Sequence, residues 1–207
     1  MTALVLLARA RGLTWSVPGV VAVVGIGAWC AHALESQSRF DEYDRVPAVV
    51  LAGLVASFLA ISCLHTADEE LDGATPRPSR AAVLGLVVGL VALGGVAALV
   101  FLPLAPFERG GAELARNLVG LTGLGLLSGA VGGQAVGWAA PFVWTGISYL
   151  GVPRDYPNHP DRASWGWLLF PASWPATWVV AGGLLLAGLV AYAWAGFQPR
   201  PRRHPLR

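Results

Sequence analysis

Long apolar runs alternate with short polar segments along almost the whole chain. Four runs are continuous and about 20 residues long, which is the length that an α-helix needs to cross the hydrocarbon core of a membrane. They cover residues 13–34, 46–64, 81–104 and 174–195. The pattern therefore predicts an all-α, polytopic integral membrane protein.

A glycine-rich apolar stretch, residues 118–152, lies between the third of these runs and the last. It is too long for one crossing and slightly short for two. Two short helices that turn near residues 132–134 fit the stretch, with the first helix beginning upstream near Gly111. The competing interpretation is one long helix that ends before Pro141, followed by a re-entrant piece.

The two-helix interpretation gives six spans within a single transmembrane domain, residues 1–207. A short re-entrant or interfacial segment is expected before the last span. The expected parts are spans at 13–34, 46–64, 81–104, 112–131, 135–152 and 174–195, a cytoplasmic loop at 65–80, an external segment at 153–173 and a basic tail at 196–207.

The distribution of arginine favours six spans over five, because cytoplasmic loops of membrane proteins carry an excess of basic residues. Five spans would leave the arginine-rich tail outside. We therefore expect both termini in the cytoplasm and the chain in the cell membrane. On this topology Arg9, Arg11, Arg77, Arg80 and the tail arginines lie inside, and Arg39, Arg45, Arg109, Arg116, Arg154 and Arg162 lie outside.

Composition agrees with a membrane protein: 55% of the residues are hydrophobic and 13% are charged, and the mean hydropathy is +0.59. The net charge of +2 is too small to indicate a nucleic-acid partner. Arg9 and Arg11 before an apolar run could mark a secretory signal, but this run is longer than a typical signal core, so we expect a retained span.

Few side chains suited to chemistry lie within the predicted spans. We find no Asp, Glu, Lys or Arg at mid-depth, whereas ion-coupled transporters usually carry them there. Motifs for nucleotide, metalloprotease or nucleophile-elbow sites are missing as well. We expect no enzymatic activity, cofactor or metal, and we expect Cys30 and Cys63 to stay free, since opposite span ends hold them apart.

Glycine spacing points to close helix packing. Four-residue intervals place small residues along one face of a helix and let another helix approach closely. Packing within the chain and packing against a second subunit both fit this pattern. The glycines concerned are Gly85, Gly89, Gly125, Gly129, Gly133 and Gly137.

The loop HTADEELDGATPRPSR is the most polar internal segment. Thr66 and Glu69 have the spacing of a helix capping box, and acidic residues in a first turn stabilise the helix dipole. Gly73 is a helix stop. We expect a short charged helix at the membrane surface; a solvated linker is the alternative.

Six spans, the acidic loop between the second and third, and PRDYPNHPDRASWGWLLFPASW before the last together resemble the membrane subunit of type-2 ABC exporters. DEELDGATPRP and RNLVGLTGLGLLSGAVGGQAVGW are also similar to small actinobacterial membrane proteins of ABC transporters. The resemblance implies short re-entrant helices before the last span and a coupling helix in the loop. Its contacts with the partner would come from Thr66, Asp68, Glu69, Glu70 and Asp72. The short segment MTALVLLARARG departs from the family's amphipathic N-terminal helix.

The resemblance implies a permease of an ATP-driven exporter, which forms the translocation path with a separate cytoplasmic ABC ATPase and a second copy of itself or a paralogous permease. The lipid bilayer surrounds it. The alternative is a membrane anchor or assembly scaffold that recruits a cytoplasmic partner without transport.

Overall fold

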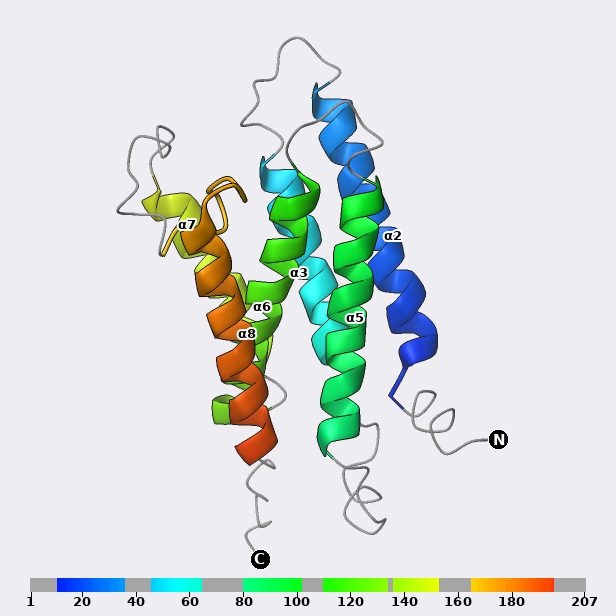
Figure 1. Cartoon of the computed structure of the whole chain (residues 1–207), viewed down its shortest axis with the longest axis vertical. Coiled ribbons are helices and arrows are strands. Elements are labelled where there is room, and N and C mark those ends of the chain that lie inside the picture. The colour runs from blue at the N-terminus through cyan, green and yellow to red at the C-terminus, as the bar shows by residue number, and fades with distance from the viewer. Residues whose placement is uncertain are drawn as a thin grey trace, which may run out of the picture.

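The computed structural model describes residues 11–35, 46–64, 80–101, 110–133, 136–152 and 165–195. Over these residues the chain forms a bundle of helices without strands (Figure 1). The helices are α2 (Leu13–Glu35), α3 (Val46–Ser62), α5 (Arg80–Phe101), α6 (Gly111–Gly132), α7 (Ala139–Gly151) and α8 (Pro175–Ala195). The all-α prediction is therefore confirmed.

Four of these helices, α2, α5, α6 and α8, are long and apolar enough to cross a membrane. α3 is equally apolar but has 17 residues. Large apolar side chains point outward around the bundle, including Leu150 at 91% exposed and Val131 at 79%. Because such a surface is stable only against lipid, the chain is a polytopic membrane protein; the membrane boundaries of its spans stay a prediction.

Helix α6 is the centre of the bundle. It packs against α3, α5 and α8, while α2 packs against α3 and α5. Successive helices alternate in direction, so α2 begins and α8 ends at the same end of the bundle (Figure 1). The side chains of α6 are consequently the most enclosed of the four long helices.

The glycine-rich stretch forms two helices, α6 of 22 residues and the shorter α7 of 13, and not one long helix that ends before Pro141. Gly133 ends α6 with a φ of +83°, a conformation that suits glycine, and its N–H donates to the carbonyl of Gly129 at 2.9 Å. α7 begins at Ala139 and has 13 residues. It is about 20 Å long at 1.5 Å per residue, which is less than the hydrocarbon thickness.

The turn segment, residues 165–174, precedes α8 and has no regular helix. It lies at the end of the bundle where α6 and α8 begin (Figure 1). Trp167 and Phe170 are completely buried there, and Leu168 is 1% exposed. The expected short segment before the last helix is thus present and packed into the bundle.

Both cysteines are free, as expected: Cys30 is half-buried on α2, and Cys63 is buried just after α3. Several tryptophans project outward near helix ends, as is typical of membrane interfaces. Trp15 is 82% exposed and Trp194 is 87% exposed. Trp167 departs from this arrangement, because its ring is enclosed.

Candidate functional site

The residues predicted to couple to a partner, Thr66, Asp68, Glu69, Glu70 and Asp72, lie outside the described residues. Their role stays a prediction. The structure does describe the base of this loop, where Arg11 is buried and its Nη1 donates to the carbonyl of Leu64 at 2.9 Å. This bond fastens the start of α2 to the end of α3.

The predicted packing glycines fall into two groups. Gly125 is enclosed, because a Cβ there would lie 3.1 Å from the carbonyl oxygen of Gly137. That same carbonyl accepts a hydrogen bond from Ser128 Oγ at 3.0 Å. Gly129 and Gly133 are buried at the end of α6. The structure thus brings this series together at the α6–α7 turn.

Gly85 and Gly89 form the second group and are both exposed on α5. A Cβ at either position would meet nothing within 4 Å. They are therefore not at a close contact within the described part of the chain, and packing against a second subunit stays a prediction for them.

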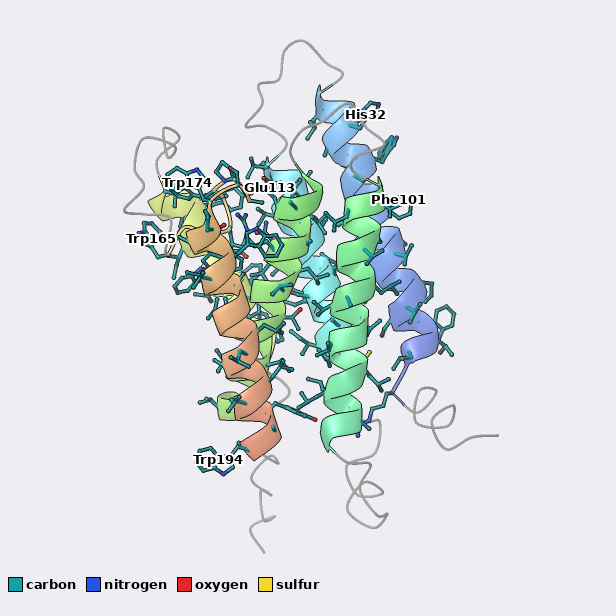
Figure 2. The ribbon with its side chains drawn as sticks, viewed as in Figure 1. His32, Phe101, Glu113, Trp165, Trp174 and Trp194 are labelled. Atoms are coloured by element: carbon teal, nitrogen blue, oxygen red, sulfur yellow. The ribbon has the colours of Figure 1, made fainter. Side chains whose placement is uncertain are left out.

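A polar cluster that the sequence analysis did not identify lies in the first turns of α6. Glu113, Arg116 and Asn117 are three and four residues apart, so a helix brings them to one face. Arg116 and Asn117 are 0% exposed. Figure 2 places Glu113 near Trp174, at the end of the bundle opposite Trp194.

Arg116 is the centre of this cluster. Its Nη1 donates to the carbonyl of Phe170 at 2.6 Å and to Thr177 Oγ1 at 3.1 Å. Its Nη2 donates to the carbonyl of Leu168 at 3.2 Å and to Asn117 Oδ1 at 3.0 Å, and its Nε donates to the same Oδ1 at 3.2 Å. A guanidinium has five N–H donors, and each of them has an acceptor here.

Glu113 and Asn117 complete the attachment. The Glu113 carboxylate accepts from the N–H of Gly110 at 2.7 Å through Oε2 and from the N–H of Ala172 at 2.8 Å through Oε1. Its charge also lies in the first turn of α6, where the helix dipole favours an anion. Asn117 Nδ2 donates to the carbonyl of Leu168 at 3.3 Å. Three side chains of α6 therefore hold the backbone of the turn segment.

Apolar contacts also hold the turn segment against the bundle. A Cβ at Gly120 would overlap the ring of Trp167, so glycine is required for that ring to lie against α6. The rings of Phe170 and Trp174 contact each other at a tilt of 57°, with centroids 5.4 Å apart. From α8, Trp178 Nε1 donates to the carbonyl of Ala172 at 3.0 Å. The turn segment is thus bound to both α6 and α8.

The sequence analysis counted Arg116 among the arginines on the outer side of the membrane, and that side stays a prediction. The structure adds that the side chain is enclosed between α6 and its neighbours. A buried cation is costly unless it is fully hydrogen-bonded. The signal was the pair Arg116 and Asn117, which follow Glu113 by three and four residues at the start of a largely apolar run. A charged residue enclosed in an apolar helix is unusual enough to mark a candidate site.

The cluster of Glu113, Arg116 and Asn117 is suited to attaching the turn segment to α6. The donors of Arg116 and both oxygens of Glu113 already have partners within the chain. The described residues include no group of three or more His, Cys, Asp or Glu side chains that could hold a metal ion. The arrangement is suited to fixing or releasing the turn segment.

No family model, curated protein or solved structure matches this chain.

Proposed function

We propose that the chain is the membrane subunit of an ATP-driven exporter of the ABC type. It resides in the cell membrane with both termini in the cytoplasm. It forms a translocation path with a second permease subunit, and a separate ATPase drives the path through the loop that contains residues 66–72. The chain itself performs no covalent chemistry.

The observation that carries this proposal is the turn segment. Type-2 exporters, which the sequence resembles, have short re-entrant elements before the last span. In this chain residues 165–174 are inserted at the end of the bundle and held by Arg116 through the carbonyls of Leu168 and Phe170. A packed element at one end of the bundle is suited to closing a path.

A second observation supports a mechanical role. The base of the coupling loop is tied to the start of α2 by Arg11. α2 in turn packs against α3 and α5, and both of these pack against α6. A force on the loop would therefore be transmitted through packed helices to the helix that holds the turn segment.

The scaffold alternative also has an observation in its favour. The donors of Arg116 are satisfied within one chain, as a static anchor requires. The two functions differ in whether a bound ATPase is stimulated. A scaffold binds its partner without changing ATP turnover.

The test reverses two charges in the loop, Glu69→Lys and Glu70→Lys together. If the loop couples to an ATPase, we expect about tenfold less co-purified ATPase, because each exposed ion pair contributes up to about 1 kcal/mol and the reversal adds repulsion. The melting temperature of the purified chain should hardly change. The complex is isolated from native membranes, where the amount of co-purified ATPase measures binding. It is then reconstituted in vesicles, where ATP turnover measures coupling.

The matched control is Asp155→Lys with Asp161→Lys, which makes the same charge change in the predicted external segment. It should leave ATP turnover unaltered. Undiminished partner binding and turnover in the loop variant would contradict coupling, and intact binding to a partner whose turnover the chain never stimulates would favour the scaffold.

A further inference from the structure

The two sides of the turn segment differ in how its polar neighbours are satisfied. On the α6 side, Glu113, Arg116 and Asn117 are all hydrogen-bonded. In α7 and the turn segment itself, three buried polar atoms have no hydrogen-bond partner among the described residues: Trp144 Nε1, Ser148 Oγ and Trp167 Nε1. Thr122 Oγ1 of α6 is a fourth such atom. A buried donor without a partner is strongly unfavourable, so such atoms normally have an occupant beside them.

Apolar clusters link the part of α7 that carries Trp144 and Ser148 to the turn segment that carries Trp167. Trp144 packs against the cluster that contains Trp167 and Leu168. Ser148 follows Trp144 by four residues, so it lies on the same face of α7 one turn further along. Val152, a further turn on, packs with Phe170. Ser148 therefore lies between two residues, Trp144 and Val152, whose side chains pack in apolar clusters that include turn-segment residues.

The chemistry of the three groups defines what they can bind. An indole N–H donates only, and a hydroxyl both donates and accepts. The occupant must therefore supply oxygen acceptors. All three groups are uncharged, and the neighbouring cation, Arg116, already donates to protein acceptors. Neutral oxygen is thus favoured over an anion, which would be buried without a countercharge.

We propose that Trp144, Ser148 and Trp167 form an internal binding site, the indole site, for an uncharged oxygen acceptor between α7 and the turn segment. Two sources have this chemistry: water, and the ester carbonyl of a membrane lipid. The site implies that the turn segment has a permanent attachment to α6 and an exchangeable one to α7. It does not depend on the exporter proposal.

The test uses the full chain with ¹⁵N-labelled tryptophan in bilayers of phosphatidylcholine that carries ¹³C at the ester carbonyls. Solid-state NMR then reports two contacts of each indole N–H: magnetisation transfer from water, and dipolar coupling to the lipid carbonyl. Trp144→Phe and Trp167→Phe assign the two signals, since each removes one N–H and retains an aromatic ring. We expect both N–H groups to show the same one of these contacts.

Transfer from water identifies water as the occupant, and coupling to ¹³C identifies lipid. If both N–H groups show neither contact, the proposal is overturned.

The melting temperature of the Ser148→Ala variant is an independent test of the site. With an occupant, this change removes a hydrogen bond and lowers the melting temperature at least as much as Ser57→Ala, whose hydroxyl donates to the carbonyl of Leu54 at 2.7 Å. Without an occupant, it removes an unpaired buried hydroxyl and raises the melting temperature. A rise would overturn the proposal even if the tryptophan variants failed to fold.

Discussion

Arg116→Met should lower the free energy of unfolding by about 2–5 kcal/mol, since a buried acceptor that loses its donor costs about 1–3 kcal/mol. The carbonyls of Leu168 and Phe170 and the Oδ1 of Asn117 would all lose donors. Methionine fills much of the volume of arginine without replacing any of these bonds. Equilibrium unfolding in mixed detergent micelles, followed by tryptophan fluorescence, measures the loss.

Two further variants make this result specific. Arg116→Lys retains the charge but not the planar fork of donors, so its loss should fall between zero and that of the methionine variant. Leu150→Ala, at a side chain that is 91% exposed to the surroundings of the bundle, should change stability by about 0.5 kcal/mol or less. A methionine variant as stable as the parent would show that the cluster is not what holds the turn segment.

The helices of this fold are largely readable from the sequence, because each apolar run is bounded by polar or glycine-rich segments. Gly133 also indicated where the long apolar stretch turns. The length of each run is a local property, and so is the conformational preference of glycine. These features needed no knowledge of which helices are neighbours.

The hydrogen bonds of the polar cluster around Arg116 could not be predicted in the same way. The acceptors of Arg116 and Asn117 in the turn segment and α8 lie 51 to 61 positions away along the chain, and two of the three are backbone carbonyls. A carbonyl carries no residue-specific signal in a sequence. Only the folding of the turn segment against α6 brings these acceptors to the guanidinium.

Glycine spacing had the same limitation. Gly85 and Gly89 have the four-residue interval of a packing face, yet a Cβ on either would meet nothing within 4 Å. Gly123 and Gly188 belong to no such pair in the sequence analysis. They nevertheless lie at a close approach of α6 and α8, where a Cβ on Gly188 would lie 2.5 Å from the carbonyl oxygen of Gly123. A four-residue interval of glycines identifies a helix face lined by small residues. Whether another helix packs closely on that face depends on the tertiary arrangement.

This difference leads to a prediction of opposite sign for two glycines on one helix. Gly188→Ala should destabilise the protein by about 1–3 kcal/mol, the usual range for a methyl group forced into a packed contact. The new Cβ would also lie 2.9 Å from Leu126 Cβ, so α8 could relieve the overlap only by moving away from α6. Because the turn segment is bonded to both helices, the separation should weaken its attachment as well.

Gly182→Ala is the matched control, since a Cβ there would meet nothing within 4 Å. Alanine is favoured over glycine within a helix by about 1 kcal/mol, so this variant should equal the parent or exceed it in stability by up to that amount. Melting temperatures of both variants in one detergent, together with the rate of proteolysis near residues 165–174, measure the contrast. Equal stability of the two variants would mean that the α6–α8 contact is looser than the structure indicates, and that the glycine of α8 is present for reasons other than close packing.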